Sequence, residues 1–192
     1  MCRFKRFVHT SILGIGLVFS ISMLSPVVHA NDSATDEESA KKELAFILTA
    51  AREQLVNLVA EATEEYEPDL LGSEEVMPAA WMLMKDGETV KRINMDRQAV
   101  GAPPSVKLLM YRAAIKSIAQ RKQIVAAAIL YAGQLHEGDE TKALVIEHEH
   151  MVGVSGHKVV GYEVEGGEIV WGEPVNHKKP FQWFYEGKPE IE

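Results

Sequence analysis

Apolar residues recur at helical spacing in the first third of the chain, with charged residues on the opposite face. The apolar stripe consists of Leu44, Ile47, Leu48, Ala51, Leu55, Leu58, Val59 and Ala62. Thr35 and Glu38 have the spacing of a capping box, which is typical of a helix start. Pro68 and Gly72 are typical of a helix end. The pattern predicts one long amphipathic helix over residues 36–66, preceded by a mobile lead-in at 31–35.

Two strand-like runs flank Asp86-Gly87, which is a common turn in short hairpins because its residues tolerate positive φ. The pattern predicts a β-hairpin over residues 79–93, in which Leu83 faces Val90. A second amphipathic pattern follows two prolines and predicts a helix over residues 105–122, packed on the sheet and the first helix.

Residues 124–135 form an apolar, nearly uncharged run that fits either a helix or a strand. Three consecutive alanines favour a helix. The basic residues before the run and the turn-like residues after it favour a strand. We expect a central strand that is buried on both faces.

Alternating apolar and polar positions between residues 142 and 173 predict three further antiparallel strands. Their expected ranges are 143–152, 158–165 and 168–172, with turns at 153–156 and at Gly166-Gly167. If Glu165 faces Glu168, one apolar face contains Val160, Tyr162, Val164, Ile169 and Trp171. The aromatic residues of the segment 174–192 predict a C-terminal strap that closes over the core.

These elements predict a single α+β domain over residues 31–192, with the order α-β-β-α-β-β-β-β. We expect an antiparallel sheet of about five to six strands covered by two helices. This order resembles that of profilin-like and roadblock-like sandwiches. Since the resemblance is one of element order, it implies a fold class and no activity.

Residues 1–30 combine a basic start, an apolar run and a final Val28-His29-Ala30, which is typical of a signal peptide cleaved after Ala30. We therefore expect a periplasmic or secreted protein. The only cysteine, Cys2, lies in this leader, so the mature chain is expected to be cysteine-free. No later apolar run has membrane length, so we expect no span after cleavage.

The chain is acidic, with a formal net charge of −8 at pH 7. The leader contains three basic and no acidic residues, so its removal would change the charge from −8 to −11. A field of this sign repels phosphate groups, which argues against nucleic acid as a partner.

The most suggestive cluster is Glu147-His148-Glu149-His150. Histidines two apart on a strand leave the same face, so His148 and His150 could bind zinc or a similar divalent metal with a further ligand. The candidates for that ligand are His136, His157 and His177. Alternatively, the two histidines are structural, or they titrate near neutral pH as a sensor of acidity. Glu147 and Glu149 leave the other face and are expected to be solvent-side charges.

No nucleophile elbow, phosphate-binding loop or dinucleotide fingerprint occurs in the sequence. We therefore expect a non-catalytic periplasmic binding or interaction module for a protein or small-molecule partner. The alternative is a metal-binding protein or metal-dependent hydrolase that uses His148 and His150. A homodimer formed through the first helix or a sheet edge is compatible with both hypotheses.

Overall fold

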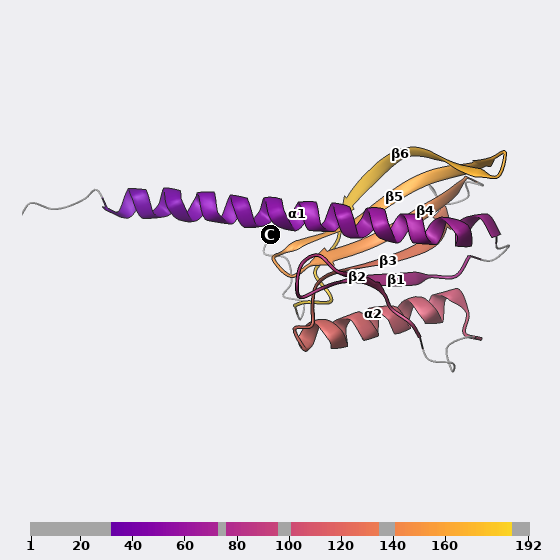
Figure 1. Cartoon of the computed structure of the whole chain (residues 1–192), viewed down its shortest axis with the longest axis horizontal. Coiled ribbons are helices and arrows are strands. Elements are labelled where there is room, and N and C mark those ends of the chain that lie inside the picture. Colours follow the sequence, from indigo (N-terminus) through magenta and orange to yellow (C-terminus); the bar gives the residue numbers. More distant parts are fainter. Residues whose placement is uncertain (1–31, 73–75, 96–100, 135–140, 186–192) are drawn as a thin grey trace, which may run out of the picture.

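The computed structural model describes residues 32–72, 76–95, 101–134 and 141–185 (Figure 1). Six strands form one antiparallel sheet in the order β2-β1-β3-β4-β5-β6. The elements are α1 (Asp32–Gly72), β1 (Ala79–Met84), β2 (Val90–Arg92), α2 (Pro104–Gln120), β3 (Ile124–Gln134), β4 (Lys142–His150), β5 (Val154–Glu165) and β6 (Glu168–Lys178). The α+β class and the predicted element order are confirmed. The expected leader lies outside the described residues.

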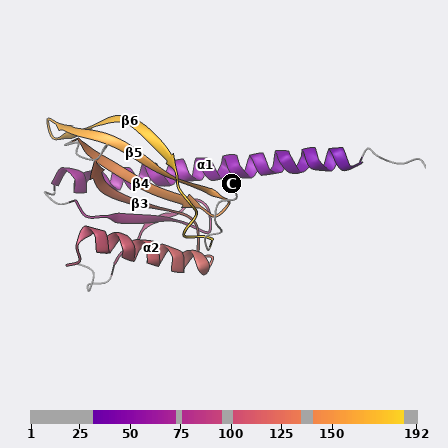
Figure 2. The same ribbon diagram turned by 180° about the vertical axis from the view of Figure 1, so that it is seen from behind.

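The two helices cover opposite faces of the sheet (Figures 1 and 2). The prediction that the second helix also packs against the first is therefore wrong. Each helix has its own core, since Leu58 and Leu144 belong to the α1 side and Ile115 and Ile129 to the α2 side. The sheet is the middle of three layers, so its central strands must be apolar on both faces.

Helix α1 is longer than predicted at both ends and continues through Pro68 to Gly72. A proline inside a helix removes one backbone hydrogen bond and costs about 3 kcal/mol. Tertiary contacts offset this cost, because Tyr66 and Leu70 are buried in the α1-side core. The Tyr66 hydroxyl also donates to the carbonyl of Met77 at 2.6 Å. Packing of this last turn therefore outweighs the local preference of the proline.

The predicted hairpin is present, and Leu83 faces Val90 as expected. Its turn is wider than two residues, because the Asp86 carboxylate accepts backbone N–H groups from Glu88 at 3.0 Å and Thr89 at 2.9 Å. Gly87 alone in this turn has positive φ, at 76°.

Residues 124–134 form the central strand β3, which confirms the strand prediction. Ala126 and Ala128 lie in the α1-side core, whereas Ala127 lies in the α2-side core. Small side chains on both faces let both helices approach the strand, so burial outweighs the helical preference of alanine.

The three-strand meander has the predicted register at its outer turn, where Tyr162 faces Trp171 and Glu165 faces Glu168. Two boundaries differ from the prediction by four residues or more. Strand β5 begins at Val154, inside the expected turn, and β6 continues to Lys178, well into the expected strap. Val160 and Tyr162 of β5 face Pro174 and Trp171 of β6, so β6 has one residue more than β5 between these two pairs. This extra residue forms a β-bulge, which shifts the register of the two strands.

The N-terminal half of α1 projects beyond the end of the sheet (Figures 1 and 2). Its apolar stripe is therefore partly uncovered, and Leu44 and Ile47 are 56% and 40% exposed. Neither α1 nor α2, the helices of the described residues, is both long and apolar enough to cross a bilayer.

Candidate functional site

Strand β4 carries the Glu147–His150 cluster and separates it into two faces. The histidines face α1, since His150 contacts Gln54 of that helix, and the glutamates face α2. Both glutamates are completely buried, at 0% exposure. The prediction that they are solvent-side charges is therefore wrong. The prediction assumed that one face of the sheet is exposed to solvent, whereas α2 and the segment after β6 cover this side of β4.

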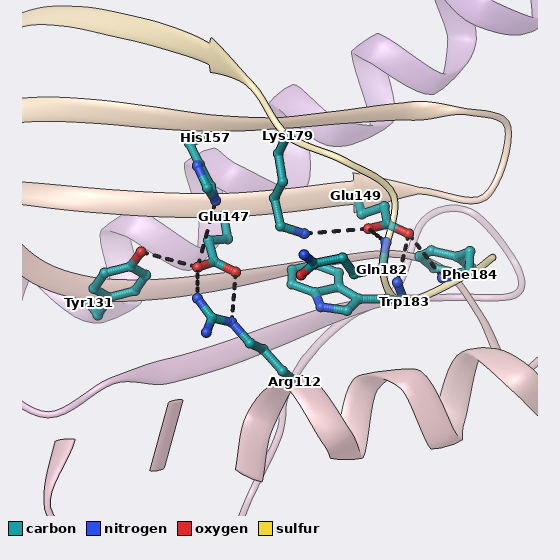
Figure 3. A network of polar contacts seen from close by, with 9 residues as sticks. All are labelled: Arg112, Tyr131, Glu147, Glu149, His157, Lys179, Gln182, Trp183 and Phe184. Carbon is teal, nitrogen blue, oxygen red and sulfur yellow. Dashed lines mark hydrogen bonds and ion pairs between the residues drawn. The ribbon is translucent and has the colours of Figure 1, made fainter. Parts of the chain in front are cut away.

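Glu147 lies among a cation, a phenol and an imidazole (Figure 3). The Arg112 guanidinium of α2 donates to both carboxylate oxygens, with Nε 3.2 Å from Oε2 and Nη2 bound to Oε1. The Tyr131 hydroxyl of β3 donates to Oε1 at 3.1 Å. His157 Nε2, from β5, lies 3.7 Å from the same oxygen. The carboxylate therefore ties α2 to three neighbouring strands.

Burial changes the protonation of the groups around Glu147. Desolvation, reinforced by the neighbouring carboxylate, raises the pKa of Tyr131 to about 12. Desolvation lowers the pKa of His157 below its ordinary value, although Glu147 acts in the opposite direction. Tyr131 is thus a neutral donor and His157 an uncharged imidazole at pH 7.

Glu149 binds the segment that follows β6 (Figure 3). Its Oε1 accepts the backbone N–H groups of Trp183 at 3.0 Å and Phe184 at 2.9 Å. Its Oε2 accepts the N–H of Gln182 at 2.9 Å and lies 3.5 Å from Lys179 Nζ. Three consecutive backbone donors thus converge on one carboxylate, which fixes the chain over β4.

Lys179 and Trp183 close the α2-side core beside Glu149. The ammonium group lies 4.0 Å from the centroid of the Trp183 ring, which is 2% exposed. Desolvation lowers the pKa of Lys179, while Glu149 and Glu147 partly counteract that shift. We call residues 179–185 the C-terminal strap.

The two histidines of β4 lie on the other side of the sheet. His150 Nε2 is 2.9 Å from Gln54 Oε1, and its Nδ1 accepts the N–H of Val152 at 3.2 Å. Both ring nitrogens of His150 therefore have protein partners. Burial lowers the pKa of His148 and of His150.

Two of the three suggested third metal ligands, His157 and His177, lie on the other face of the sheet from these histidines. His157 faces Glu147 across β4 and β5, and His177 faces His157 across β5 and β6, so both lie on the α2 side. His136 lies outside the described residues. Among the residues that the structure describes, no group of three or more His, Cys, Asp or Glu side chains could hold a metal ion. Metal binding at His148 and His150 stays a prediction.

A groove runs between α1 and the outer strands on the α1 side of the sheet, with a cavity of about 420 Å³. Apolar side chains dominate its lining: Val56, Val59, Ala60, Leu144, Ile146, Val160, Trp171 and Pro174. Glu64, Glu67 and Lys158 add charges to the same groove. The Trp171 indole N–H donates to Glu67 Oε1 at 3.3 Å, which holds the ring in the groove wall.

The sequence pattern did not indicate Arg112, Tyr131 or Lys179 as partners of the glutamates. The available signal was the position of β4 beside a strand already expected to be buried on both faces. A carboxylate on such a strand requires a cation or several N–H donors.

Comparison of the chain with protein-family models, with curated proteins and with solved structures finds no match.

Proposed function

We propose that this protein is an exported, non-catalytic binding module, and that it binds its partner in the groove between α1 and strands β5 and β6. The observation that carries the proposal is the groove itself. Its cavity of about 420 Å³ has the size of a ligand pocket, and its lining combines apolar side chains with a few charges.

Exposed apolar side chains on the helical wall support a binding role. Val56 is 64% exposed, and the neighbouring Ala60 is also exposed. The sheet contributes Val160 and Trp171 to the opposite wall. An apolar ligand or side chain placed between these walls would remove their surface from water, which contributes roughly 25 cal/mol for each Å² buried.

The state of the β4 carboxylates supports a role without catalysis. Both oxygens of Glu149 accept backbone N–H groups of the C-terminal strap, and both oxygens of Glu147 bind Arg112. A general base must reach a substrate proton, whereas these oxygens already have donors within the fold. The proposed export depends on the leader pattern of residues 1–30.

Fluorescence titration with the neutral apolar dye N-phenyl-1-naphthylamine tests the groove. We expect saturable binding with a stoichiometry of one, weakened about tenfold or more by Ala60→Glu, because a charge would enter the apolar wall. Asn57→Glu is the matched control, since it adds the same charge at an exposed α1 position outside the groove lining.

Equal affinity of the wild type and Ala60→Glu would contradict the proposal, as would equal weakening by Asn57→Glu. Circular dichroism of each variant verifies that the fold is retained.

A further inference from the structure

A second cavity, of about 570 Å³, lies beside the middle of α1, where Leu48 and Arg52 precede the groove residues of that helix. Its walls come from α1, the β4–β5 turn, the end of β6 and the C-terminal strap. None of its lining residues belongs to the groove of the proposed function. The inference drawn from it is therefore independent of that function.

The cavity gathers positive charge on an acidic protein. Arg52 and Lys178 both line it and are exposed. Within the part of the chain that the structure describes, no ion pair is formed by either side chain. Lys179 also lines the cavity, but its ammonium group pairs with Glu149. Two cations are therefore available to a ligand in a chain whose net charge is −8.

The remaining wall is apolar. Leu48 of α1 and Pro180 and Phe181 of the strap face the same cavity. Ligand pockets of several hundred Å³ typically combine such apolar walls with a few convergent polar groups that fix orientation. The lining thus matches a molecule with one anionic end and an apolar body.

We infer that this cavity binds a small organic anion, whose carboxylate or phosphate head contacts Arg52 and Lys178 and whose apolar body packs on Leu48 and Phe181. Because the overall field of the protein repels anions, the attraction is local, and it weakens as salt screens the two exposed cations.

Calorimetric titration of the full mature chain with decanoate and with decyl phosphate, below their micellar concentrations, tests this inference. We expect saturable binding of at least one anion at low salt, and at least tenfold weaker binding of decanol, which has the same chain without the charge. Decanoate binding alone identifies a carboxylate site, and tighter binding of decyl phosphate identifies a phosphate site.

Variants then locate the site. We expect Arg52→Gln and Lys178→Gln each to weaken anion binding at least fivefold. Arg121→Gln removes an exposed cation on α2's C-terminal side and should leave the affinity unchanged. Equal loss in Arg121→Gln, no loss in Arg52→Gln, or loss caused by Ala60→Glu in the groove would each overturn the inference.

Discussion

Glu149→Gln tests whether a buried carboxylate holds the C-terminal strap. The substitution keeps the size of the side chain but replaces one accepting oxygen by an NH₂ group that cannot accept a hydrogen bond. If the amide nitrogen takes the place of Oε2, the Gln182 N–H loses its acceptor, at 2.9 Å in the wild type. Lys179, whose side chain is 3% exposed, loses its counter-charge in either orientation.

The expected cost follows from these losses. A hydrogen bond to a charged group contributes about 1.5–3 kcal/mol. Removing one partner of a buried ion pair costs about 3–5 kcal/mol, a range that includes the bonds the pair makes. We therefore expect Glu149→Gln to lower the free energy of unfolding by about 3–5 kcal/mol. Adding Lys179→Met should restore part of this loss, because the unpaired ammonium group is then absent.

Urea unfolding followed by tryptophan fluorescence measures the change, and hydrogen exchange at Gln182, Trp183 and Phe184 locates it. Glu163→Gln is the control, because Glu163 is an exposed strand residue of β5. A cost of less than about 1 kcal/mol for Glu149→Gln, or unchanged protection of the three strap amides, would show that Glu149 does not hold the strap.

Four further outcomes follow from the structure and the sequence. Arg112→Leu leaves buried Glu147 without its cation and should lower the free energy of unfolding in urea by about 2–3 kcal/mol. This is less than the roughly 3–5 kcal/mol of a fully buried pair, because Arg112 is 34% exposed. An unchanged unfolding midpoint would contradict the pairing. Burial lowers the pKa of His148 and His150, so the unfolded chain binds more protons than the folded chain below about pH 6.5. The free energy of unfolding should therefore fall from pH 7 to 5, and it should fall less steeply in the double variant His148→Gln/His150→Gln. A chelator should leave the melting temperature of the protein unchanged. Stoichiometric zinc in the purified protein that is lost in the same double variant would support the metal hypothesis instead. Mass spectrometry of the protein expressed with residues 1–30 should find Asn31 at its N-terminus, whereas a retained leader would contradict the predicted cleavage.

Local patterns were sufficient to predict most of the fold. The register that places Tyr162 opposite Trp171 follows from alternation and a two-glycine turn, both of which depend on neighbouring residues. The end of α1 could not be predicted in this way. Its passage through Pro68 depends on the burial of Tyr66 and Leu70 by strands that lie later in the sequence.

The candidate site was the hardest feature to predict. The alternation of side chains along a strand correctly placed Glu147 and Glu149 on one face of β4, but it could not show that this face is covered. The cover comes from Arg112 on α2 and from the strap beyond Lys178, which are distant in sequence. The groove depends in the same way on α1 lying across β5 and β6, an arrangement that no single segment encodes.

The indole resonances of the three tryptophans test the proposed binding groove most directly. Trp171 lines the groove, whereas Trp81 and Trp183 are buried in the two cores. In ¹H–¹⁵N spectra of the protein titrated with N-phenyl-1-naphthylamine, we predict a progressive, saturable shift of the Trp171 Nε1–H signal, with the other two indole signals unchanged. A Trp171 signal that stays in place while the dye binds would contradict the proposed groove.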